Sequence, residues 1–260
     1  MGSQPRTLAY ARSVHPLLIV AAAGYGALAG ALLARPAYRF AVPAGEPWRA
    51  TCPAGHRLTG RGAAGWLGAA RCAGCPPTAA PPRAAIGTAL ATAGCCAALA
   101  AAVGARPELV VWLLAAPVMV LLATVDLAVQ RLPDPLTLPL AGGLAAGLGV
   151  TTLLPGAGGS WPGALLGGLA LGACYLVLFL VNPNGMGFGD VKLALSVGVA
   201  LGWYGWPAVL AGTFVGFLLA AGYGTALVIA GRAGRRTAVP FGPFMALGAL
   251  AGLALAGLGS

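Results

Sequence analysis

Residues 162–181 read PGALLGGLALGACYLVLFLV, a run without a charged side chain. A helix needs about 20 consecutive apolar residues to cross the hydrocarbon core of a bilayer. Similar runs recur along the chain between polar or proline-rich breaks. They predict eight spans, at residues 15–34, 84–104, 109–125, 136–154, 162–181, 191–206, 207–230 and 239–257. The predicted fold class is an all-α polytopic membrane protein.

The composition agrees with this class. Of the 260 residues, 59% are hydrophobic and 8% are charged, whereas a soluble domain carries about 25% charged residues. An ordinary soluble globule is therefore excluded. In a soluble protein the net charge of +10 would suggest a nucleic-acid partner. In a membrane protein we interpret it as basic residues that orient the chain, and we expect no nucleic-acid partner.

The basic residues also predict the orientation. The loop between the first two spans contains Arg35, Arg39, Arg49, Arg57, Arg61, Arg71 and Arg83. Cytoplasmic loops carry an excess of Lys and Arg, so we place this loop in the cytoplasm and both termini outside. The first apolar run is longer than the core of a signal peptide, and we expect it to be retained as a span. Four tryptophans then fall at outer ends of spans, where aromatic rings favour the lipid headgroups: Trp112, Trp161, Trp203 and Trp206.

We expect three segments: a first span in residues 1–35, a cytoplasmic Cys/His loop domain in 36–83, and a membrane domain in 84–260. The loop domain contains Cys52-x3-His56 and, further on, Cys72-x2-Cys75. Three cysteines and one histidine form an accepted tetrahedral zinc set, and a cytoplasmic location disfavours disulfides. The sequence therefore predicts zinc at these four residues, and the alternative is a knuckle that binds no metal.

Acidic residues are scarce, and all three aspartates, Asp126, Asp134 and Asp190, fall at predicted cytoplasmic ends of spans. An ionisable residue near the hydrocarbon is costly and usually functional. Two predicted spans separate Asp126 from Asp190, so the chain returns to the same face and the two carboxylates can meet there.

The residues before Asp190 suit a bound peptide. Gly185, Gly187 and Gly189 alternate along this stretch, and glycine lets an extended peptide approach the backbone closely. Two neighbouring carboxylates share a proton, so that one can activate water while the other polarises a carbonyl. The pattern predicts peptide hydrolysis by an aspartyl dyad.

Other interpretations remain open at this point. The aspartates can cap helices or pair with Arg131 and Lys192, and Asp134, between two prolines, suits a turn or cap that supports the site. A small transporter could use Asp126 and Asp190 as a proton or cation relay, although transporters often place such residues near the midplane and contain internal repeats. A non-catalytic membrane scaffold is the third reading.

Three motifs occur in order at predicted cytoplasmic ends. They are Asp126 followed by Leu132-Pro133-Asp134 and Thr137-Leu138-Pro139, then GMGFGDVKL at 185–193, and PFGPF at 240–244. Over about residues 109–250 this combination resembles the type IV prepilin peptidases, membrane aspartyl proteases of the GxGD class. The resemblance implies that Asp126 and Asp190 form the catalytic pair. We expect them to be supported by Gly187, Gly189, Lys192 and Asp134.

The resemblance also implies the substrate and the cofactors. Such an enzyme cuts the leader from prepilins or pseudopilins at the cytoplasmic face of the plasma (inner) membrane, and the proteolytic step needs no cofactor. Many bacterial members carry two Cys-x-x-Cys pairs in the first cytoplasmic loop and methylate the new amino terminus with S-adenosylmethionine. Here one pair is intact, the loop is a degenerate version, and no acidic residue lies between Arg49 and Arg106. S-adenosylmethionine is expected only if methylation is retained.

Overall fold

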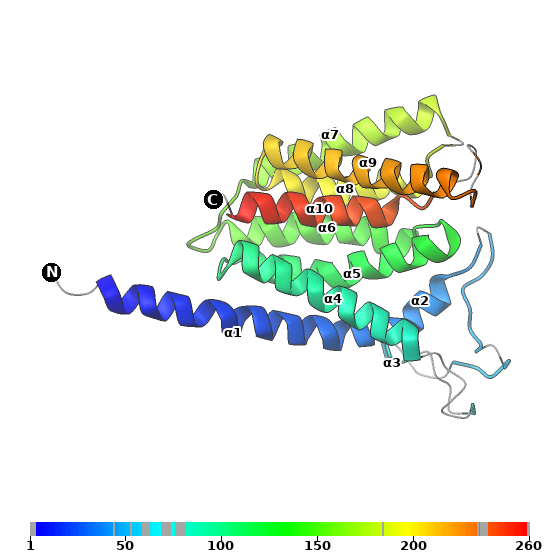
Figure 1. Cartoon of the computed structure of the whole chain (residues 1–260), viewed down its shortest axis with the longest axis horizontal. Coiled ribbons are helices and arrows are strands. Elements are labelled where there is room, and N and C mark those ends of the chain that lie inside the picture. Colours follow the sequence, from blue (N-terminus) through cyan, green and yellow to red (C-terminus); the bar gives the residue numbers. More distant parts are fainter. Residues whose placement is uncertain are drawn as a thin grey trace.

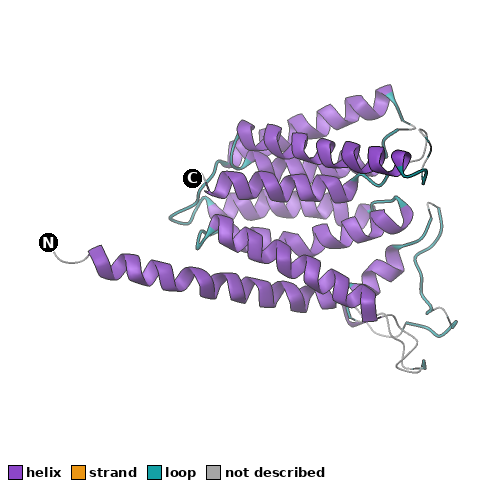
Figure 2. Cartoon of the chain, viewed as in Figure 1, coloured by secondary structure: helices purple, strands orange, loops and turns teal. Residues whose placement is uncertain are grey.

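The structure is a computed structural model that describes residues 4–43, 45–52, 54–58, 63–68, 74–75, 82–183, 185–232, 234 and 239–258. In this part of the chain the regular structure is helical (Figure 2), apart from one isolated bridge between Thr51 and Arg57. The helices are α1 (Gln4–Ala31), α2 (Ala34–Phe40), α3 (Ala63–Trp66), α4 (Pro82–Val103), α5 (Glu108–Val129), α6 (Asp134–Thr151), α7 (Trp161–Val181), α8 (Phe188–Gly202), α9 (Trp206–Ile229) and α10 (Gly242–Leu258).

Each predicted span coincides with one long helix, and the limits differ by a few residues at most places. Among the described residues, four helices are long and apolar enough to cross a membrane: α4 from Ala84, α5, α7 and α9. A fifth is added if the apolar part of α1 and α2, which meet at a 45° bend, count as one span. The predicted fold class, an all-α polytopic membrane protein, is confirmed with these four or five candidate spans.

The long helices form one bundle in which successive helices from α4 onward run in opposite directions (Figure 1). Because of this alternation, the end of α5 and the starts of α6, α8 and α10 gather at one end of the bundle, which we call the site end. The helix α2 and the described parts of residues 41–75 lie at the same end. Aspartates far apart in the sequence are therefore brought to one end of the molecule.

Small residues set how closely α7 and α8 pack. A Cβ added at Gly167 would lie 2.5 Å from the carbonyl oxygen of Gly198 and 2.7 Å from the Cα of Gly202. Small side chains at helix interfaces in membranes let backbones come this close. The contact fixes the position of α8, and with it the start of α8 at the site end.

The segment after α1 braces the end of α5. In the described structure, Phe40 of α2 packs with Leu33, and with Leu121 and Val125 of α5, in a small buried cluster. Val125 has no exposed surface and directly precedes Asp126. The amino-terminal part of the chain thus contacts the turn of α5 that carries this aspartate.

Candidate active site

Asp126 lies in the last turn of α5. The helix continues to Val129 and ends because Gln130 adopts a left-handed conformation with φ 51°, from which its N–H donates to the carbonyl of Asp126. The sequence placed Asp126 just beyond the end of its span. In the structure it belongs to the helix, and it is 4% exposed.

The carboxylate of Asp126 contacts a helix that comes much later in the chain. Its Oδ2 accepts a buried hydrogen bond from the N–H of Gly242 at 2.8 Å, and Gly242 is the first residue of α10. The PFGPF motif therefore reaches Asp126. The sequence included this motif in the resemblance but gave Gly242 no role, because a backbone N–H leaves no signal in residue chemistry.

Asp190 is the third residue of α8 and is 8% exposed. Its Oδ2 accepts the N–H of Gly187 at 3.1 Å. A carboxylate in the first turn of a helix satisfies an otherwise unpaired N–H there. The expected capping role is therefore present, although Gly187 occupies the N-cap position and Asp190 acts from inside the helix.

Asp126 and Asp190 line one cavity of about 300 Å³ at the site end. Its other lining residues are Gln130, Arg131, Leu132, Asp134, Gly187, Phe188, Gly189 and Lys192. Gly189 has little free space, because an added Cβ would lie 3.0 Å from the Cβ of Leu132. Every residue that the sequence assigned to the dyad or its support thus lies at this cavity.

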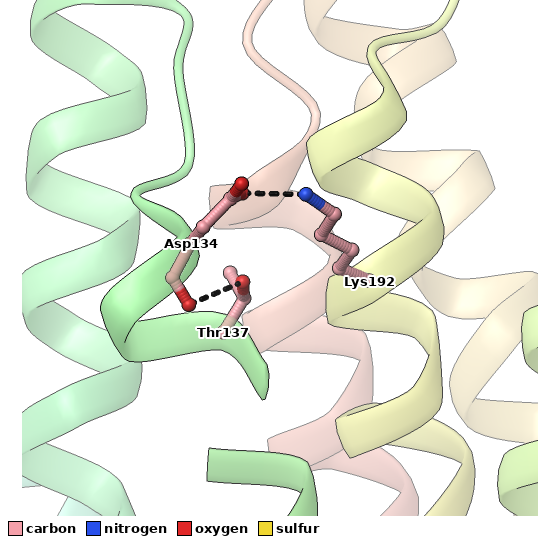
Figure 3. Close-up of polar contacts among 3 residues, drawn as sticks. All are labelled: Asp134, Thr137 and Lys192. Carbon is pink, nitrogen blue, oxygen red and sulfur yellow. Dashed lines mark hydrogen bonds and ion pairs between the residues drawn. The ribbon is translucent and has the colours of Figure 1, made fainter. Parts of the chain in front are cut away.

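Asp134 and Lys192 form an ion pair across the cavity (Figure 3), with 2.6 Å between Lys192 Nζ and Asp134 Oδ1. The Asp134 side chain is 65% exposed and that of Lys192 is 18% exposed. The Thr137 hydroxyl donates to the Asp134 carbonyl at 3.5 Å. The start of α6 is therefore linked to the start of α8 beside Asp190.

Two buried carboxylates on one cavity have a specific chemical capacity. Neighbouring carboxylates cannot both ionise cheaply, so one tends to hold a proton while the other is charged. The charged group can take a proton from water and the protonated group can donate one. The pair can therefore carry out acid–base catalysis on a bound amide.

A second group of polar side chains lies in the loop after α2. The Sγ atoms of Cys52 and Cys75 are 3.6 Å apart, and His56 Nδ1 lies 3.7 Å from the first and 3.3 Å from the second. Zinc–ligand bonds of about 2.0–2.3 Å in a tetrahedron separate ligands by about 3.3–3.8 Å. These three residues therefore fit a zinc ion. The fourth predicted ligand, Cys72, lies outside the described residues.

This loop also contacts the rim of the cavity. Arg131 lines the cavity, and its Nη1 donates to the carbonyl oxygen of Pro43 at 2.9 Å. Together with the packing of Phe40 on α5, this contact links the first loop to the residues around Asp126.

Residues 109–228 match the model of the type IV leader peptidase family. In these residues, which make up a little under half of the chain, it is similar to that family. The match contains Asp126, Asp134, Asp190 and Lys192. It does not contain the Cys/His loop or α10.

Three relatives illustrate the extent of the similarity, each a prepilin leader peptidase/N-methyltransferase. The protein from Aeromonas salmonicida (strain A449) is 37% identical over 134 residues, which is 50% of this chain and 44% of the relative. The one from Burkholderia pseudomallei (strain K96243) is 35% identical over 172 residues, 64% of this chain and 47% of the relative. The one from Bacillus subtilis (strain 168) is 30% identical over 132 residues, which is 51% of this chain and 50% of the relative.

The chain thus spans about half the length of the leader peptidases that it matches. No solved structure shows significant similarity to it.

Proposed function

We propose that this protein is a membrane aspartyl endopeptidase that removes the leader of type IV prepilins or pseudopilins. The observation that carries the proposal is the pair of buried carboxylates, Asp126 and Asp190, on one cavity inside the segment that matches the leader peptidase family. The cavity lies at one end of the bundle, whereas transporters place relay residues near the midplane. A transporter is therefore not favoured.

In the proposed reaction, water attacks the carbonyl carbon of the scissile peptide bond. One carboxylate of the dyad takes a proton from this water, and the protonated partner donates a proton to the carbonyl oxygen. Collapse of the tetrahedral intermediate breaks the C–N bond, and the leaving amine receives a proton from the dyad. Water is consumed and no other reactant is required. Gly187 and Gly189 lie at the wall of the cavity, and the missing side chain at Gly189 lets the start of α8 pack against Leu132.

We assign the site end to the cytoplasmic side of the plasma (inner) membrane. The support for this orientation is the excess of arginine in residues 36–83, because the described parts of this loop lie at the same end as the cavity. The proposed topology has eight spans, one for each long helix. The segments are a first span in residues 1–35, the loop domain in 36–83 and the peptidase domain in 84–260. Membrane lipid and the prepilin-like substrate are the proposed partners.

The proposal includes zinc as a structural ion in the loop. Cys52, His56 and Cys75, with Cys72 as the fourth ligand, would hold it, and the ion would order a loop that has little core of its own. Asp126 and Asp190 carry the proteolytic step.

Methyl transfer to the new amino terminus, which the names of the relatives include, finds no support in the residues of this loop. Glu46 is the one carboxylate in residues 36–83, and it is exposed. The amino-acid and ribose ends of S-adenosylmethionine need polar partners. The residues present do not fit that cofactor.

The test is cleavage of a co-expressed candidate prepilin in membranes, with sequencing of the new amino terminus. Wild-type protein should yield a product shortened at a site after a glycine and before the hydrophobic stem. Asp126→Asn and Asp190→Asn should each abolish the product while inserting into the membrane normally. Glu46→Gln, an equivalent change at an exposed residue that does not line the cavity, should leave cleavage intact. Retained cleavage in either dyad variant refutes the assignment.

A further inference from the structure

The start of α10 makes one polar contact outside its own helix that the dyad chemistry does not explain. The first N–H groups of a helix have no partner within it. In the first turn of α10, the N–H groups of Phe244 and Met245 donate to the carbonyl of Phe241, and Pro243 has no N–H. The N–H of Gly242 is left, and it donates to Asp126 Oδ2 at 2.8 Å inside the protein.

The contact leaves little room for a side chain at position 242. A Cβ added at position 242 would lie 2.9 Å from Asp126 Oδ2, 3.3 Å from its Cγ and 3.4 Å from its Cβ. The whole carboxylate therefore packs against the face of Gly242 that has no side chain. An alanine at this position would have to displace Asp126 or the start of α10.

The contact also acts on the charge of Asp126. Asp126 lies in the last turn of α5, where the carbonyl end of the helix disfavours a negative charge, while the N–H end of α10 favours one. A hydrogen bond to a carboxylate stabilises its charged form. The titratable and charged groups that line the same cavity are Asp190, Lys192, Asp134 and Arg131, and Tyr175 of α7 neighbours Asp190.

We infer that Gly242 is a positioning residue for cleavage, whose backbone N–H holds Asp126 in the orientation and charged form that accept a proton from water. The inference rests on the proposed peptidase function. It extends the site to α10, which lies beyond the matched residues 109–228.

The first test compares three glycine-to-alanine variants of the full chain in the membrane cleavage assay. Gly242→Ala should lower the cleavage rate by about a hundredfold, the loss expected for a catalytic group displaced by about 1 Å. Gly222→Ala lies on α9, where an added Cβ meets nothing within 4 Å, and should behave as wild type. Gly248→Ala lies on α10, where an added Cβ would meet the backbone of α9 at Gly212, away from Asp126.

The pH profile separates positioning from general damage. Without the hydrogen bond, a carboxylate that must be charged is protonated at higher pH, so the acidic limb of the profile for Gly242→Ala should move up by about one unit. Gly248→Ala disturbs α10 without touching Asp126. The acidic limb of its pH profile should therefore stay at the wild-type pH, however much folded protein this variant yields. An unshifted limb in Gly242→Ala overturns the inference.

A readout that needs no cleavage keeps the inference separate from the proposed function. A hydrophobic carbodiimide modifies protonated carboxyl groups, and mass spectrometry of the Asp126 peptide gives the pH of half-maximal modification. Gly242→Ala should raise this pH relative to Gly222→Ala. If this shift appears in a protein that cleaves no prepilin, the proposed function fails and the role of Gly242 in holding the charge of Asp126 stands.

A further measurement does not depend on the folding of Gly242→Ala. Hydrogen exchange of the peptide at the start of α10 should be faster in Asp126→Asn than in wild type, because the N–H of Gly242 loses its charged acceptor. Equal exchange rates would contradict the inference.

Discussion

Lys192 and Asp134 join α8 and α6 near their starts by an ion pair of 2.6 Å (Figure 3). Asp190 lies two residues before Lys192, so the pair connects two walls of the cavity next to Asp190. Exposed ion pairs contribute little to stability, typically below about 1 kcal/mol. The value of this pair therefore lies in the placement of the two helix starts rather than in the stability of the fold.

The first prediction follows from that exposure. Asp134→Asn should reduce prepilin cleavage by less than about tenfold, because the amide keeps an oxygen for Lys192 and loses only a screened charge. The thermal unfolding temperature should not change. Cleavage rates of Asp134→Asn and Asp190→Asn are measured in parallel in membranes. A loss of cleavage in Asp134→Asn as complete as in Asp190→Asn would show that Asp134 takes part in the chemistry.

The second prediction concerns the packing of α7 on α8. Gly198→Ala should lower the thermal unfolding temperature in detergent, because the new methyl group meets the backbone of Gly167 and overpacking costs about 1–3 kcal/mol. Gly142→Ala, on α6 with nothing within 4 Å of the added Cβ, is the matched control. Equal unfolding temperatures for the two variants would mean that α8 can move away without cost.

Much of this architecture could be predicted from the sequence, because lipid imposes long apolar runs that are easy to recognise. The three aspartates could be singled out as candidate site residues because charged side chains are rare in such a chain, and all three line one cavity. The sequence was wrong about Trp112 and Trp203, which were expected at the lipid headgroups and are 2% and 1% exposed. An apolar helix has no contrast between its lipid-facing and protein-facing sides, so burial could not be predicted.

Contacts made by backbone atoms were also beyond prediction from the sequence. The hydrogen bond from Gly242 to Asp126 depends on how α10 lies against α5, and nothing in the residue types indicates this. By contrast, the grouping of Cys52, His56 and Cys75 was predicted from the spacing of the ligands. The contact of the first loop with Arg131 required the structure.

The third prediction concerns zinc in the full-length protein. Purified wild type should contain about one zinc ion per chain, and Cys75→Ser should lose it, because a serine hydroxyl does not replace a thiolate ligand. Cys96→Ser, at a fully buried cysteine in α4, is the control and should keep the metal. Zinc is measured by elemental analysis, and a wild-type protein without stoichiometric zinc rejects the site.

The last prediction concerns the end of the bundle opposite the cavity. Glu108, at the start of α5, has no exposed surface. Its Oε1 accepts the N–H of Gly158 at 3.1 Å and lies 3.5 Å from the Tyr204 hydroxyl. This side chain joins the loops before α7 and before α9 to α5.

Glu108→Ala should therefore destabilise the protein by about 1–3 kcal/mol, since the half-buried N–H of Gly158 loses its partner. Tyr204→Phe removes only the longer contact and should cost less. Thermal unfolding in detergent ranks the two, and equal losses would place the stabilising contact at Tyr204. In Glu108→Ala protein that remains folded, the pH profile of cleavage should match wild type, because the dyad lies at the other end of α5. A shifted profile would show that the two ends are coupled through this helix.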